Sequence, residues 1–299
     1  MAHYLDALKT TVGSGLLSFL VTPLPKDAPS RLLKAIVIGA LSIVTFAPSA
    51  SAITPQEIQA RGTMVVGVQA DQMPWGFINK EGKNDGNDID VVKLMASELN
   101  VNVEFVRITA VNRIPMLLTK KVDFLVPGMS ILPERAKVIQ YAKPYSTNEI
   151  VVYARKELAI TKPEDLGGHV IGVARGSAFD TLATKTAPSG TDIRRYDDDA
   201  STVQALLTGQ ADAVLGSITY GVVLGRAGKT ADFENKYKVS DNLLGMAVRP
   251  AEKEMLDWLN AFIDRHKADG KLAAIYKKWM LVDLPELPDT VPGISFTIK

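Results

Sequence analysis

A run of residues near the middle of the chain combines three groups that can bind a carboxylate. An apolar segment starting at Asp123 leads into a Gly-x-Ser turn at Gly128 and Ser130, and the run ends at Arg135. Glycine lets the backbone approach a ligand closely, serine offers a hydroxyl and an N–H, and arginine presents a planar fork that matches a carboxylate. A Gly/Ser/Pro segment after a strand is more often a plain turn. The flanking sequence must therefore decide between a binding loop and a turn.

The elements that would position this turn follow a repeated pattern. Short β-branched runs alternate with segments of helical periodicity, first at 64–68, 88–99, 101–106, 111–119 and 122–126, then at 170–173, 179–184, 192–196, 201–207, 211–215 and 218–226. Alternation of buried strands and helices predicts an α/β fold with doubly wound sheets. Two sets of such elements, in a chain near the length at which one core stops growing, indicate two lobes.

The N-terminal region has the order of a secretory signal. Basic residues at 31–34 precede an apolar core at 35–46 and a small-residue stretch at 48–52. The apolar core is shorter than the ~18 residues of a membrane span, so we predict a cleaved leader at 1–52, ending at Ala52. The leader is long, so the alternatives are a start site placed too far upstream and a retained anchor. Cleavage would release the protein into the periplasm.

Composition excludes several kinds of site and partner. The chain has no cysteine, which rules out disulfides, a thiol nucleophile, a cysteine zinc site and a lipid-modified cysteine. Without the leader, 30 basic residues face 31 acidic ones, which argues against nucleic-acid and membrane-surface partners. His3, His169 and His266 are scattered, and the acidic loop at 84–90 lacks the spacing of a calcium loop. We predict neither a metal nor a cofactor.

The flanks of the Gly-x-Ser turn resemble a known family. Gly128-Met-Ser-Ile-Leu-Pro-Glu-Arg-Ala-Lys137, followed by Tyr141-Ala-Lys-Pro-Tyr145, is similar to the pattern of extracellular solute-binding protein family 3, the polar amino-acid receptors of ABC importers. Weaker matches occur in the family's order at 65–68, 70–75, 88–90, 164–168, 196–199, 210–213, 267–272 and 276–279. The resemblance covers about Thr63 to Met280.

This resemblance implies a two-lobed periplasmic binding protein of type II, with a two-strand hinge formed by 149–154 and 243–248. We expect lobe 1 at 53–150, lobe 2 at 151–243, a return to lobe 1 at 244–282 and a C-terminal tail at 283–299. The tail is rich in proline and is expected to be extended rather than packed.

The resemblance also assigns roles to single residues. It implies that Arg135 binds the ligand's α-carboxylate, with Ser130 and the Gly128 backbone beside it. Ser177 follows a strand and opens a helix, so its N–H would add an anion donor, unless it is an ordinary N-cap. Arg113 lies in a loop that resembles the glutamate/aspartate branch of the family, where arginine faces a side-chain carboxylate. The alternative is a cap or salt bridge within its own helix.

Several positions complete or depart from the family's site. Arg175 would supply a third guanidinium. The acidic residue that many relatives use for the α-ammonium falls at Ser217, and the aromatic residue over the ligand falls at Gln72. Trp75 is expected at the cleft border, with a core position as the alternative. For the ammonium we considered Asp71, Asp197 and Glu149 without placing them.

These residues predict a periplasmic substrate-binding component of an amino-acid ABC importer, specific for a polar or acidic amino acid. The protein would act as a monomer, close its lobes on the ligand and pass it to a permease. One alternative is a dehydratase-like enzyme of the same fold, but Thr219 and Tyr220 stand where such an enzyme needs an acid. A ligand-sensing adaptor for a membrane receptor is the other. We predict that the protein is not an enzyme.

Overall fold

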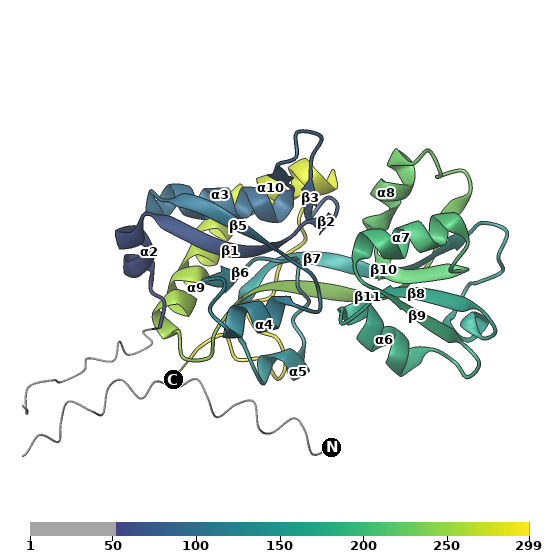
Figure 1. Cartoon of the computed structure of the whole chain (residues 1–299). Helices are drawn as coiled ribbons and strands as arrows, with labels where there is room; N and C mark the ends of the chain where they lie inside the picture. Colours follow the sequence, from purple (N-terminus) through teal and green to yellow (C-terminus); the bar gives the residue numbers. More distant parts are fainter. Residues whose placement is uncertain (1–51, 299) are drawn as a thin grey trace, which may run out of the picture. The chain divides into compact units, whose positions relative to one another are not determined.

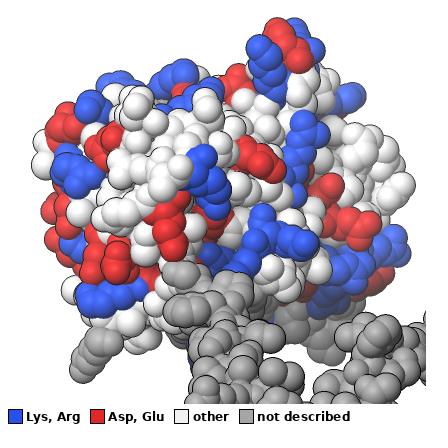
Figure 2. All heavy atoms as spheres, turned by 60° about the vertical axis from the view of Figure 1, so that its left-hand side comes forward, with Lys and Arg blue, Asp and Glu red and all other residues white. Residues whose placement is uncertain are grey.

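The computed structural model describes residues 52–298, so the predicted leader lies outside the described residues except for Ala52. Within the described part, none of the helices has the length and apolar character needed to cross a bilayer. Lysines, arginines and acidic residues are interspersed over the face seen in Figure 2. This mixture agrees with the nearly neutral charge of the sequence.

One eight-stranded sheet runs through the protein in the order β5-β1-β6-β11-β7-β10-β8-β9. At one end, β1 (Thr63–Gln69) pairs in parallel with β5 (Asn102–Ile108) and β6 (Phe124–Leu125). At the other, β8 (Val170–Ala174) pairs in parallel with β9 (Asp192–Tyr196) and β10 (Ala213–Ser217). Each end is therefore a parallel α/β unit of its own.

Two long strands carry the chain between these units. β7 (Gln140–Arg155) leads out of the first lobe and β11 (Phe233–Val248) leads back, and they pair antiparallel along their length (Figure 1). The sequence pattern predicted two sheets joined by a hinge. Because β7 and β11 bond to each other and to the strands on both sides, the two sheets are continuous. The predicted two-lobed fold class is confirmed.

The remaining elements flank these strands. A small sheet of β2 (Asp71–Gln72), β3 (Gly76–Ile78) and β4 (Asn84–Asp85) lies in the first lobe. The first lobe also holds α2 (Pro55–Arg61), α3 (Asn87–Leu99), α4 (Arg113–Leu118), α5 (Pro133–Ala136), α9 (Lys253–Ala268) and α10 (Lys271–Met280). The second lobe holds η1 (Pro163–Leu166), α6 (Ala178–Thr186), α7 (Asp199–Thr208) and α8 (Tyr220–Arg226).

Each lobe has its own apolar core. In the first lobe, residues before β7 such as Met64 and Val92 pack in one cluster with residues after β11 such as Leu259 and Phe262, and all four are fully buried. A separate cluster fills the second lobe, from Ile150 to Phe233. Burial of apolar side chains thus stabilises the packing of the segment after β11 against the first lobe. Each large apolar side chain contributes about 1.5–3 kcal/mol.

The tail needs a correction. It contains no helix or named strand among the described residues, but it is packed: Leu287 is 5% exposed and Phe296 is 7% exposed. The Asn260 amide donates to the Phe296 carbonyl at 2.7 Å. Prolines prevent regular structure here, but apolar residues between them still bury against the first lobe.

Candidate functional site

A small polar cavity lies where the two lobes meet. We call it the inter-lobe cavity, and its walls are Gln69, Gln72, Ala110, Arg113, Gly128, Ser130, Ser177, Ala178, Phe179 and Asp199. The first six come from the first lobe, and the last four come from the starts of α6 and α7. Its volume is about 20 Å³, close to what a single water molecule needs. In this arrangement the lobes are closed on each other.

The Gly-x-Ser turn forms one wall. Gly128 has φ 56°, in the left-handed region where glycine is favoured, and a Cβ there would lie 3.4 Å from Asp88 Oδ2. Its N–H donates to Tyr145 Oη at 3.2 Å, so this predicted ligand donor already has a partner. Ser130 is buried at 5% exposure. The structure therefore leaves Ser130, more than the Gly128 N–H, to face a ligand.

Arg135 lies beside the cavity rather than in its wall. The side chain is buried, and Nη1 donates to the Ser130 carbonyl at 3.1 Å. Nη2 donates across the lobes to the Gly176 carbonyl at 3.2 Å. A guanidinium has five N–H donors, so at most three remain after these two bonds, and the Tyr141 side chain takes one of them. Arg135 thus connects the binding turn of one lobe to the turn before α6 in the other.

Arg113 is a buried cation in the cavity wall. It is 4% exposed, its Nε has no hydrogen-bond partner, and it forms no ion pair with any residue in the described part of the chain. Burial, and then the like charge of Arg135, lower its pKa to about 9. The alternative of a helix cap does not apply, since the Asn112 carboxamide, not Arg113, closes the preceding turn by accepting from Thr109 N–H. Two guanidinium groups therefore lie at one cavity, and one of them lacks a counter-ion.

Asp199 is the residue that sequence reasoning missed. Its carboxylate accepts from the Gln69 amide at 3.2 Å, from the Gln72 amide at 3.3 Å and from the Tyr220 hydroxyl. Its backbone N–H donates to Asp71 Oδ2 at 2.8 Å. The Asp199 carboxylate of the second lobe thus accepts hydrogen bonds from two side chains of the first lobe. A third first-lobe side chain, that of Asp71, accepts the backbone N–H at the start of the same helix.

The local sequence explains this position. Asp198 is the N-cap of α7 and forms a capping box with Ser201, so Asp199 becomes the first residue of the helix. In the sequence, the acidic run at 197–199 looks like an ordinary helix cap. Nothing in this local pattern indicates that Asp199 is buried. Of the groups considered for the ammonium, Asp197 has a side chain that is 95% exposed, and Glu149 pairs with Lys238 at 2.9 Å. Only Asp71 lies near Asp199.

The two carboxylates that face each other across the lobes have raised pKa values. Burial, and then the charge of Asp71, raise the pKa of Asp199 to about 7. Burial also raises the pKa of Asp71. Closing the lobes therefore favours a proton, or another cation, at this pair.

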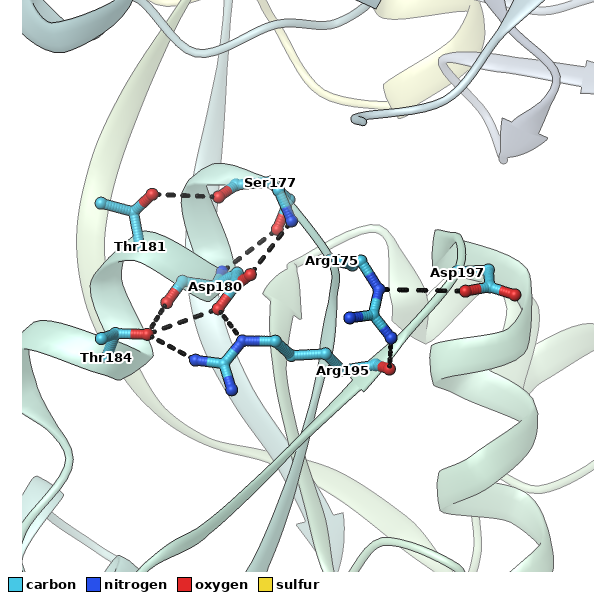
Figure 3. A network of polar contacts seen from close by, with 8 residues as sticks. Arg175, Ser177, Asp180, Thr181, Thr184, Arg195 and Asp197 are labelled. Carbon is cyan, nitrogen blue, oxygen red and sulfur yellow. Dashed lines mark hydrogen bonds and ion pairs between the residues drawn. The ribbon is translucent and has the colours of Figure 1, made fainter. Parts of the chain in front are cut away.

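In the turn before α6, Ser177 and Arg175 make contacts other than the ligand contacts that the sequence predicted (Figure 3). Ser177 caps α6 by accepting from Asp180 N–H at 3.1 Å, and its own N–H donates to the Ala174 carbonyl at 3.2 Å. Ser177 nevertheless forms part of the cavity wall. The Arg175 guanidinium lies near Asp197 and donates to the Arg195 carbonyl, and its side chain is 52% exposed. Arg175 is therefore a surface residue here, not a third cavity cation.

Two further predicted site residues lie outside the cavity wall. Ser217 is fully buried and bonds to the Asn148 carboxamide at 3.1 Å and to Thr219. Trp75 is 1% exposed and packs against the Tyr276 ring at 6.2 Å between centroids. Both belong to the interior: the Ser217 hydroxyl has its partners there, and the Trp75 ring is packed, although its Nε1 has no hydrogen-bond partner. Gln72, in contrast, lies in the cavity wall as expected.

A buried carboxyl supports the Gly-x-Ser turn from behind. Asp88 is fully buried, and its Oδ1 accepts from the Tyr145 hydroxyl at 2.8 Å. The same hydroxyl accepts the Gly128 N–H, so Asp88, Tyr145 and Gly128 form a chain of hydrogen bonds. Burial raises the pKa of Asp88 to about 7. Asp88 thus positions the turn without touching the cavity.

With this geometry in place, the comparisons with known proteins identify the class. The chain belongs to the bacterial extracellular solute-binding proteins, family 3, whose pattern matches residues 64–282. The predicted resemblance is confirmed over nearly the same range.

Individual relatives span almost the whole protein. The chain is similar to TcyJ, the L-cystine-binding protein of Escherichia coli strain K12, at 25% identity over 263 residues, or 87% of this chain and 97% of the relative. It is 27% identical to the L-arginine-binding protein of Pseudomonas aeruginosa over 262 residues, or 85% of this chain and 96% of the relative. The solved structure of AncCDT-1, an ancestral amino acid-binding protein and precursor of cyclohexadienyl dehydratase, matches with a TM-score of 0.68 and 33% identity. That match covers 75% of this chain and 98% of AncCDT-1.

Replacing Asp88 is expected to change how stability depends on pH. Between about pH 4 and pH 7 the folded protein keeps a proton on Asp88 that the unfolded chain has released, so the free energy of unfolding falls as pH rises through this window. In Asp88→Asn this contribution, about 1 kcal/mol per pH unit, disappears. Denaturant unfolding at pH 5, 6 and 7 measures it, with the exposed Asp257→Asn as control. Parallel pH curves for wild type and Asp88→Asn would contradict the assignment.

Ligand-free closure is expected to depend on the carboxylate pair. The closed state raises the pKa of Asp199 and Asp71, so it binds protons more tightly and is favoured below about pH 7. Since the chain has no cysteine, dyes at Glu104→Cys and Lys229→Cys report the distance between lobes by energy transfer. We expect a more closed protein at pH 6 than at pH 8, and a flatter response in Asp71→Asn. A pH-independent distance in the wild type would refute this.

Proposed function

We propose that the protein is the periplasmic substrate-binding component of an ABC importer for an acidic amino acid, glutamate or aspartate. The observation that carries the proposal is Arg113, a buried and unpaired cation in a cavity that closes between two lobes. Relatives named for cystine and arginine binding support an amino acid as the ligand class. We infer delivery to a membrane permease, by a protein that acts as a monomer.

The charges around the cavity favour a ligand with one net negative charge. Arg113 and Arg135 supply two positive charges, and the Asp71–Asp199 pair supplies one negative charge when its two carboxyls, both with raised pKa values, hold one proton between them. An acidic amino acid has the opposite set, with two carboxylates and one ammonium. A cationic ligand such as arginine would add a third positive charge to a buried site, which is costly in a low-dielectric environment.

A binding mode follows from these positions. The ligand's ammonium would replace the Gln69 and Gln72 amides as donors to Asp199, which strengthens the contact because both partners are charged. The α-carboxylate would face Ser130 and the free donors of Arg135. The side-chain carboxylate would reach Arg113 Nε. These assignments keep Arg135 and Ser130 in the roles that the sequence predicted, and move the ammonium site from Ser217 to Asp199.

The narrow cavity indicates how a ligand enters. At about 20 Å³ it does not admit an amino acid while the glutamine amides lie on Asp199. Binding therefore begins in an open state, and closure follows when the ligand supplies better partners for Asp199 and Arg113 than the protein does. Closure is then a population shift that depends on contacts made only in the closed state.

Catalysis in the cleft is the second candidate. Asp199 is a buried carboxyl with a pKa near 7, which is what a general acid requires, and AncCDT-1 is described as a precursor of a dehydratase. Against it, the groups around the Asp199 carboxylate are donors, which favours its ionised form as an acceptor rather than as a proton donor. We expect a bound amino acid to be recovered chemically unchanged after long incubation, by mass spectrometry.

Calorimetry with purified protein tests the ligand. We expect glutamate or aspartate to bind with a Kd of about 1 μM, or about −8 kcal/mol, and arginine to bind at least ~100-fold more weakly. In Arg113→Gln, affinity for the acidic ligand should fall about 100-fold while glutamine binds better, because the buried charge is gone.

The surface variant Arg175→Gln is the matched control and should leave affinity unchanged, since its guanidinium lies outside the cavity. Preference for arginine or cystine over glutamate, or an unchanged Kd in Arg113→Gln, would rule out the acidic assignment.

A further inference from the structure

A second hollow adjoins the inter-lobe cavity, and Gln72 and Asp199 belong to the walls of both. Its volume is about 370 Å³, far larger than the cavity. Phe77 and Ile78 of the first lobe form one side, and residues of α7 and α8 form the other. We call it the α7/α8 groove. The hydrogen bond from the Gln72 amide to Asp199, at 3.3 Å, lies between the two hollows.

Residues of both helices line the groove. Val203 and Leu207 are four residues apart on α7, so they share a face, and Val223 and Arg226 are three apart on α8. Tyr220, at the start of α8, bonds to Asp199, and Arg226 ends the same helix. Six residues of helix span ~9 Å.

Charged residues of both signs line the groove. Asp71 and Asp199 line the end next to the cavity, and Arg226 lines the groove as well. The Arg226 guanidinium lies 5.7 Å from the centre of the Phe77 ring, across the lobes. It makes no ion pair with any residue among those the structure describes. The rest of the wall is mainly apolar, from residues such as Ile78, Val203 and Leu207.

We propose that the α7/α8 groove binds an arm attached to the ligand's amino nitrogen: a short hydrocarbon chain that ends in a carboxylate. The inference rests on the proposed function, since it places the amino-acid part of the ligand in the inter-lobe cavity. Asp199 belongs to both walls, so a nitrogen bonded to it can carry a substituent into the groove. A secondary amine stays protonated and keeps its charge for Asp199.

The size of the groove determines how long the arm can be, and the charge of Arg226 determines which chemical group ends it. A chain of about four to six carbons covers most of the ~9 Å along α8, and the flexible arginine side chain spans the rest. The apolar walls match the hydrocarbon part. The terminal carboxylate meets Arg226, whose planar fork is suited to it and is free of a protein carboxylate. The Gln72 side chain must turn aside to let the arm pass.

Calorimetry with three compounds on the full-length mature protein tests the proposal. The probes are glutamate, glutamate with a 5-carboxypentyl group on its nitrogen, and glutamate with a hexyl group there. We expect the carboxypentyl compound to bind at least ~10-fold more tightly than glutamate and than the hexyl compound. Arg226→Gln should remove that advantage and leave glutamate binding unchanged.

Two more variants separate the groove from the cavity. Leu207→Trp fills the groove and should abolish binding of the carboxypentyl compound while glutamate still binds. Arg107→Gln, on an exposed part of β5, is the matched control and should change neither. Thermal unfolding of each variant verifies that it is folded.

The possible results distinguish the two proposals. If glutamate binds but the carboxypentyl compound binds more weakly, the groove assignment is overturned and the function stands. Equal affinities for the carboxypentyl and hexyl compounds, or an unchanged advantage in Arg226→Gln, overturn the role of Arg226. If no acidic amino acid binds in any form, both proposals fail.

Discussion

The closed arrangement of this protein depends on one buried carboxylate, that of Asp199. It belongs to the second lobe, but two of its three side-chain partners, Gln69 and Gln72, belong to the first. A buried carboxylate without such donors would carry a large desolvation cost, so the lobes can close only when donors are supplied to it. In this structure the glutamine amides supply them, and a ligand ammonium would do so with a full charge.

The first-lobe side of the cavity contains a buried positive charge. Arg113 is buried with an unpaired Nε close to the like charge of Arg135, and both belong to the first lobe. A protein can tolerate an uncompensated buried cation where a ligand provides the missing anion. In the proposed complex, the ligand would therefore bring one cationic group to Asp199 of the second lobe and one anionic group to Arg113 of the first.

The architecture lets these two requirements meet in a single movement. The lobes have separate apolar cores, and only β7 and β11 carry the chain between them among the described elements. In the proposed mechanism, closure would bend these two strands while each lobe keeps its own core. The side chains that line the cavity lie at strand ends and helix starts, where the rigid core holds them in position. The Asp88–Tyr145–Gly128 chain shows this support most directly, because a fully buried group of the core reaches the backbone of the binding turn.

The sequence alone determined the fold class and the family, since periodicity and ordered motifs are local properties of the chain. It also pointed to Arg113, Ser130 and Gln72 as residues of the cleft, and the structure places all three in the cavity wall. The local sequence pattern could not show which side chains point toward the other lobe. Asp199 reads as part of a helix cap, Arg175 reads as a cavity cation, and Trp75 and Ser217 read as site residues. Which of them face the cavity depends on how two lobes, built from segments far apart in the chain, pack against each other.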